Sequence, residues 1–178
     1  LGDSKVMIRY LATNTGKGAG TRVFVGGGVL LPSKNTLTSD PYFLDGRDKI
    51  EEHRHFSISD GCYKVIGEMQ FYIKRDSDPV FIGGAFLART PIKENKYGYK
   101  SPTTYDLSLT ATTKEKPSVK GSFNLNLGLL HTKYGYWNGF KEPNSQATIA
   151  NFGLGLLKNT NAGVVSLSVL KPVFIVGG

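Results

Sequence analysis

The residue types that most readily hold a metal ion lie close together between positions 51 and 55. Glu51, His53 and His55 alternate along this segment, so an extended chain would place all three on one face. Imidazole and carboxylate groups suit zinc, copper or nickel. No cysteine joins the pattern, and the third histidine, His131, is far away in sequence. The segment therefore has two interpretations, a metal site and a charged, solvated loop.

A second set of chemically capable side chains lies on predicted β-strands. Strand alternation points seven charged residues away from the apolar face of the sheet. Rings of charge tune selectivity in pores, and the excess of positive charge in this set would favour anions. The alternative is that the charges pair with one another and fill a narrow barrel. The seven predicted lumen-lining residues are Arg9, Arg22, Lys64, Glu68, Lys74, Asp106 and Lys120.

An aromatic, glycine-rich stretch follows at residues 134–140. Tyr134, Tyr136 and Trp137 could stack on a sugar or an aromatic solute, or could anchor a loop among lipid headgroups. Signals for catalysis are weak: there is no G-x-S-x-G elbow and no phosphate-binding G-x-x-x-x-G-K. His131 with Ser122 and Asn124 is the one serine and histidine pairing to consider. We expect neither an enzyme nor a cofactor.

Period-2 alternation predicts the elements that position these residues. It is clearest at residues 63–75, 104–112 and 119–130, where one face is apolar and the other mostly polar. Five more stretches are typical of strands: 5–12, 21–31, 80–90, 148–157 and 163–171. A short ninth strand is predicted at 173–176. The sequence therefore predicts an all-β protein with at least eight strands, forming a single domain over residues 1–178.

The connections between the predicted strands alternate regularly between short and long. Short ones at 13–20, 75–79, 114–117 and 159–163 are separated by long polar ones at 32–62, 91–102 and 132–147. Outer-membrane barrels have this asymmetry, with short periplasmic turns and longer outer loops. The pattern indicates an antiparallel, up-and-down transmembrane β-barrel. Its apolar face would contact outer-membrane lipids, and its small, polar face would line the lumen.

Composition narrows the possible partners. The 22 glycines follow no collagen-like period, and 39% hydrophobic residues are too many for a disordered chain. The net charge is +8, but lysine and arginine are scattered along the chain without a basic run. A nucleic-acid-binding protein would concentrate them in a basic stripe with stacking aromatics. We therefore expect no nucleic-acid partner.

Several short motifs resemble the outer-membrane family of phenol-degradation meta-pathway proteins, which are transporter-like barrels. The resemblance implies a location in the bacterial outer membrane and a barrel of more than eight strands, about 12, of which this chain would be a part. The motifs are LGD before VMIRY (1–10), GGGVLLPS (26–33), HFSISDG (55–61), NKYGY (95–99) and LKPV (170–173).

The function expected from these observations is passive passage or binding of small solutes, hydrophobic or aromatic ones included. Two alternatives stay open at this point. The barrel could be a structural or anchoring subunit of a larger outer-membrane assembly with membrane-complex partners. It could also be a soluble, lipocalin-like ligand-binding barrel, which would bury its apolar face inside.

Overall fold

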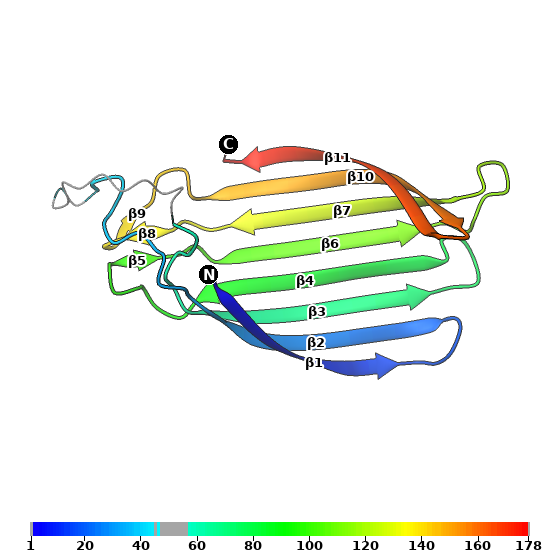
Figure 1. Ribbon diagram of the computed structural model, residues 1–178, viewed down its shortest axis with the longest axis horizontal. Coiled ribbons are helices and arrows are strands. Elements are labelled where there is room, and N and C mark those ends of the chain that lie inside the picture. The colour runs from blue at the N-terminus through cyan, green and yellow to red at the C-terminus, as the bar shows by residue number, and fades with distance from the viewer. Residues whose placement is uncertain (1, 45, 47–56, 178) are drawn as a thin grey trace.

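The computed structural model describes residues 2–44, 46 and 57–177, and its described residues form an all-β protein (Figure 1). Eight long strands make one sheet, and three two-residue strands make a second, smaller sheet. The long strands are β1 (Ser4–Asn14), β2 (Gly20–Leu31), β3 (Lys64–Lys74), β4 (Phe81–Pro91), β6 (Thr104–Thr112), β7 (Ser122–Thr132), β10 (Ala147–Thr160) and β11 (Gly163–Val176). The short strands are β5 (Tyr99–Lys100), β8 (Tyr136–Trp137) and β9 (Phe140–Lys141).

The main sheet follows chain order, β1-β2-β3-β4-β6-β7-β10-β11, and every neighbouring pair is antiparallel. The predicted up-and-down order of eight strands is therefore confirmed. The predicted ninth strand is instead the end of β11, which continues through Pro172. A proline has no N–H to donate, and it fits here because β11 pairs on one side only.

The sheet is not closed into a barrel. Within the part of the chain that the structure describes, β1 pairs only with β2 and β11 pairs only with β10. The chain contains no described helix of the length and apolarity needed to cross a membrane. The sheet is strongly curved, and β1 and β11 curl toward the viewer in Figure 1.

The predicted asymmetry of the connections is confirmed. The short turns all lie at one end of the sheet, at the right of Figure 1, which we call the short-turn end. The long connections and the small sheet lie at the other end, the long-loop end. This arrangement follows directly from antiparallel pairing, because successive connections alternate between the two ends of an antiparallel sheet.

The two faces of the main sheet differ sharply in chemistry. One register row carries Tyr10, Val25, Met69, Phe86 and Leu107, continuing to Leu129. These side chains lie on the outer, convex face and are solvent-exposed in this chain, as are Ile8 at 78% and Leu167 at 72%. On the described strands β1 to β7 this face has no Asp, Glu, Lys or Arg. Only Lys158 on β10 and Lys171 on β11 interrupt it.

The tyrosines of the main sheet lie on both of its faces and at different levels along the strands. Tyr63 and Tyr105 lie at the long-loop end of the convex face, where Tyr105 stacks with His131 at 6.3 Å between ring centroids. Tyr10 lies within the row described above, away from the strand ends, and Tyr72 lies on the opposite face. These four tyrosines therefore do not form one level on the convex face.

Candidate functional site

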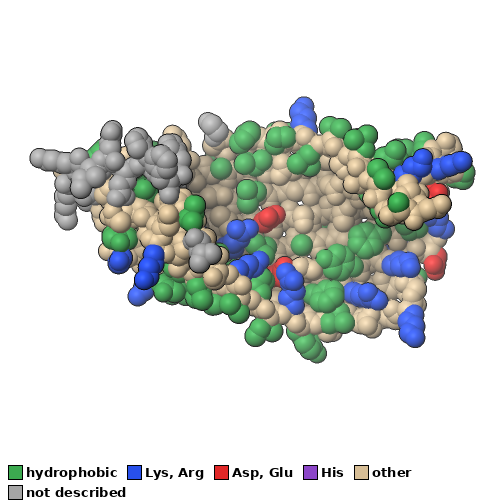
Figure 2. Space-filling view, in the orientation of Figure 1, with side chains coloured by type: hydrophobic (Ala, Val, Ile, Leu, Met, Phe, Trp, Pro, Cys, Tyr) green, Lys and Arg blue, Asp and Glu red, His purple; other side chains and the backbone are tan. Residues whose placement is uncertain are grey.

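The concave face of the sheet carries the polar side chains that are candidates for function (Figure 2). At its centre, Arg9 on β1 reaches across β2 to Glu68 on β3, with Nε–Oε2 at 2.5 Å and Nη2–Oε1 at 3.1 Å. Gly26 is the register partner of both residues. A Cβ at Gly26 would lie 3.2 Å from Arg9 Cγ and 3.3 Å from Glu68 Oε2. The glycine therefore leaves the space in which the ion pair bridges two non-adjacent strands.

The ion pair continues into a hydrogen-bonded chain along β3. Gln70 Nε2 donates to Glu68 Oε1 at 2.7 Å, and the Tyr72 hydroxyl donates to Gln70 Oε1 at 2.8 Å. These residues are two apart, so they share one face of the strand. The chain holds the Glu68 carboxylate, whose side chain is only 8% exposed, between two sets of donors.

All charged side chains on the concave face lie on the first five strands of the sheet, β1 to β6. The strands β7, β10 and β11 carry none on this face among their described residues. Six of the eight are basic, and Lys64 and Arg9 are engaged in ion pairs. The eight charged residues are Lys5, Arg9, Arg22, Lys64, Glu68, Lys74, Arg89 and Asp106.

Six of the seven predicted lumen-lining residues therefore lie on the concave face. Lys120 was predicted wrongly as a strand residue: it lies before β7, in the turn 113–121, with φ +47°. The strand begins at Ser122, three positions later than the alternation suggested. Lys5 and Arg89 were not predicted, although each has the parity of its strand's inward residues, so alternation could have identified both.

Next to these charges, the concave face of β6 and β7 carries a neutral cluster of amide and hydroxyl side chains. Asn124 Nδ2 donates to Thr110 Oγ1 and to Thr112 Oγ1, both at 2.9 Å, and Asn126 donates to Asn124. Gly153 and Gly155 on β10 lie in the rows of these asparagines. A Cβ at Gly155 would lie 2.8 Å from Ser168 Oγ on β11, so the glycine permits close packing at this point.

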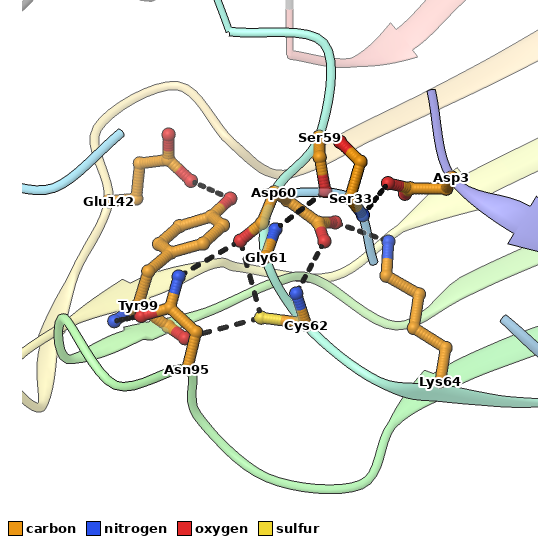
Figure 3. A network of polar contacts seen from close by, with 10 residues as sticks. All are labelled: Asp3, Ser33, Ser59, Asp60, Gly61, Cys62, Lys64, Asn95, Tyr99 and Glu142. Atoms are coloured by element: carbon orange, nitrogen blue, oxygen red, sulfur yellow. Dashed lines mark hydrogen bonds and ion pairs between the residues drawn. The ribbon is translucent and has the colours of Figure 1, made fainter. Parts of the chain in front are cut away.

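A network of polar contacts links the long connections to one another at the long-loop end (Figure 3). Asn95 is its hub: its Nδ2 donates to the Asp60 carbonyl at 3.0 Å, and its Oδ1 accepts from the backbone of Tyr97 and Tyr99. Asp60 accepts from the Cys62 N–H at 3.0 Å and pairs with Lys64. The predicted lumen residue Lys64 is thus tied to the loops as well as to the sheet.

The aromatic stretch 134–140 belongs to this network rather than to a free loop. Trp137 is 2% exposed and packs on Tyr99 with 4.7 Å between ring centroids. The Tyr99 hydroxyl donates to the buried carboxylate of Glu142 at 3.0 Å. Trp137 is therefore a core residue of the loops and is not available to stack on a solute or to anchor in lipid, as had been considered. Tyr136 is half-buried, and Tyr134 is exposed beneath the Lys141 ammonium.

Other sequence candidates are not brought together by the fold. Glu51, His53 and His55 lie outside the described residues, and the described residues hold no cluster of three potential metal ligands. Ser122 and His131 lie at opposite ends of β7 and on opposite faces, which excludes a direct Ser–His pair. The Cys62 thiol is buried and lies 3.3 Å from the Tyr99 carbonyl oxygen. Burial raises the pKa of Cys62, so its reactive thiolate form is disfavoured.

Comparison with known proteins adds no identity. No family model, no curated protein and no solved structure matches this chain. The resemblance to the phenol-degradation barrels therefore stays a prediction from the sequence motifs, and the site must be interpreted from its own geometry.

Proposed function

We propose that the chain forms all or part of the wall of a β-barrel in the bacterial outer membrane. Small solutes would pass through this barrel, anions in preference to cations. The observation that carries the proposal is the separation of chemistry between the faces. The convex face is a wall of exposed Val, Ile, Leu, Met and Phe, and the concave face holds the charges, amides and hydroxyls. Exposed apolar area on this scale marks a contact surface, and a membrane barrel is apolar outside and polar inside.

The dimensions of the strands support the same proposal. Six of the long strands have 9 to 12 residues, and a tilted strand of about 9–11 residues crosses a bilayer. The free edges of β1 and β11 would have to be paired in a closed barrel, because unpaired backbone N–H and C=O groups are costly in lipid. Their pairing with each other or with further strands is part of the proposal.

The proposed preference for anions follows from the concave charges. The concave face carries six basic and two acidic residues, and one of the acidic residues, Glu68, is neutralised by Arg9. Lys5, Arg22, Lys74 and Arg89 form no ion pair within the described part of the chain. A lumen with this excess would concentrate anions and repel cations.

A soluble, lipocalin-like barrel is less compatible with the face chemistry, since it would place the apolar face inside the curvature and the polar face outside. A structural or anchoring role has one observation in its favour: β11 is 14 residues long, has one free edge and is exposed along its whole length. Conductance separates the two membrane roles, because an anchoring barrel with a filled lumen would insert into bilayers without passing ions.

Adjacent residues in the middle of β6 test the face assignment. Leu107 lies on the convex face and Ser108 on the concave face. Leu107→Lys should lower the stability of the protein folded into vesicles by about 2–4 kcal/mol, because it places a charge in hydrocarbon. The matched variant Ser108→Lys should leave it nearly unchanged. The measurement is urea-induced unfolding in lipid vesicles. Equal effects of the two variants, or a wild-type protein that stays monodisperse without detergent or lipid, would contradict the proposal.

A further inference from the structure

A small pocket lies on the concave side at the short-turn end of the sheet. Its volume is about 270 Å³, and it is bounded by the glycines of the β1–β2 turn, by Arg22 and by Tyr72, Lys74 and Phe81. Ligand pockets for small organic molecules begin at about 300 Å³, so this one has room for a compact molecule and not for a large one. No acidic side chain of the described residues lines it.

Two basic side chains in this pocket have N–H donors without a partner among the described residues. Arg22 uses its Nε to donate to Asn14 Oδ1 at 3.2 Å, which leaves its terminal N–H groups available. The Lys74 ammonium has no hydrogen bond or ion pair to any described residue. Glu68 is engaged by Arg9 and Asp78 by Lys116, and Asp76 in the β3–β4 turn does not line the pocket. The pocket therefore lacks an internal counter-ion.

An aromatic platform forms the other wall. The rings of Tyr72 and Phe81 are stacked, with 6.0 Å between centroids and 28° between planes, and Phe24 meets Tyr72 edge-on at 6.1 Å. Gly83 is the register partner of Tyr72, and a Cβ there would lie 3.0 Å from the Phe81 ring. The absence of that Cβ lets Phe81 lie over the sheet beside Tyr72. The hydrogen bond from the Tyr72 hydroxyl to Gln70 fixes the platform.

We propose that this pocket binds a small monocarboxylate that carries a flat apolar group, such as an aromatic acid. Arg22 and Lys74 would take the carboxylate, because a guanidinium binds it through paired N–H groups and an ammonium adds a point charge. The Tyr72–Phe81 platform would take the flat group by stacking. The inference deepens the proposed function, since it names a class of anion that would bind inside the barrel wall, and it rests on the concave face being accessible to water.

Three probes test the two halves of the pocket separately, and two of them, benzoate and benzamide, are nearly equal in size. Benzoate has both the charge and the ring, benzamide has the ring without the charge, and acetate has the charge without the ring. Titration calorimetry on the full chain in detergent micelles should show binding of benzoate, and binding of benzamide and acetate that is at least about tenfold weaker, because each lacks one set of contacts.

Variants locate the binding. Arg22→Gln and Lys74→Gln should each weaken benzoate binding by about tenfold, the effect of losing one charge-assisted hydrogen bond. Arg89→Gln is the matched control, because Arg89 lies on the concave face outside the pocket and forms no ion pair with the described residues. This variant should bind benzoate as the wild type does.

Two results would overturn the inference: benzamide binding as tightly as benzoate to the wild type, or equal losses in all three arginine and lysine variants. The probe comparison uses the wild type alone, so the inference remains testable if a variant does not fold. The proposed function fails by a different result, the absence of conductance or of insertion into vesicles, so the two failures are distinguishable.

Discussion

The two sides of the concave face use different means to build a polar surface. The side formed by β1 to β6 carries all eight concave charges and organises the central ones through Arg9, Glu68 and Gln70. The side formed by β7, β10 and β11 is uncharged on this face, and Asn124 joins it to β6 through hydrogen bonds to Thr110 and Thr112. In the proposed barrel, a solute would therefore meet a cationic wall on one side and an uncharged wall on the other. The following predictions test that difference.

The largest effect is expected on ion selectivity. The double variant Arg22→Glu with Arg89→Glu changes the charge of the β1 to β6 side by four units. We expect the anion-to-cation permeability ratio, measured from reversal potentials across a planar bilayer, to fall by on the order of tenfold. The same change in the short turns, Lys17→Glu with Lys114→Glu, should have a much smaller effect. Equal effects would mean that overall charge, and not the charged side of the lumen, sets selectivity.

The next effect concerns the ion pair that bridges β1 and β3. Glu68→Gln removes the carboxylate that Arg9 and Gln70 share, and we expect the free energy of unfolding to fall by about 1 kcal/mol, since Arg9 is half-exposed and can be hydrated instead. Asp106→Asn is the matched control, because Asp106 lies in the same register row without a side-chain partner among the described residues. If Asp106→Asn loses as much stability as Glu68→Gln, the ion pair between Arg9 and Glu68 is not the cause of the loss.

On the neutral side, Asn124→Ala removes the donors to Thr110 and Thr112. The free energy of unfolding should fall by about 0.5–1 kcal/mol, while the permeability ratio stays at the wild-type value. The two measurements together distinguish a wall that stabilises the sheet from a wall that selects ions. A change in the permeability ratio of Asn124→Ala would contradict the view that only the charged side selects ions.

The smallest effect is expected where the turns of the two sides meet. Asp78 in the β3–β4 turn pairs with Lys116 at 2.5 Å and accepts from the Lys114 N–H at 2.7 Å, both in the β6–β7 connection. The hydrogen bond from Lys116 and then the one from Lys114 hold the pKa of Asp78 below its usual value. A carboxyl group with a lowered native pKa stabilises the fold above its unfolded pKa of about 3.9, and this contribution is lost as the pH falls through the native pKa.

The check is the melting temperature of Asp78→Asn against that of the wild type at several pH values. The wild type should be slightly more stable at pH 6, and the difference should shrink toward pH 3 because the carboxyl group becomes protonated. A difference that is constant with pH would show that the pair contributes nothing through its charge. Asp76→Asn, a neighbouring exposed carboxyl group that forms no ion pair with the described residues, serves as the control.

Most of the main sheet could be predicted from the sequence because its signals are local. Alternation identified the eight long strands and assigned Arg9, Glu68 and Lys74 to one face, since side-chain direction along a strand depends only on parity. The strand start near Lys120 was wrong because turn residues before Ser122 happened to continue the alternation. The three short strands were not predicted, since two residues are too few to show a period.

The sequence by itself determined which side chains share a face and at which end of the sheet each connection lies, because both follow from period-2 geometry and antiparallel order. The tertiary structure decided which residues meet across strands. The Arg9–Glu68 bridge depends on register and on the missing side chain of Gly26, and the burial of Trp137 depends on Tyr99 and on loops distant in sequence. It also decided that the polar face is the concave one. Parity gives two faces, but only the direction of curvature shows which of them is enclosed.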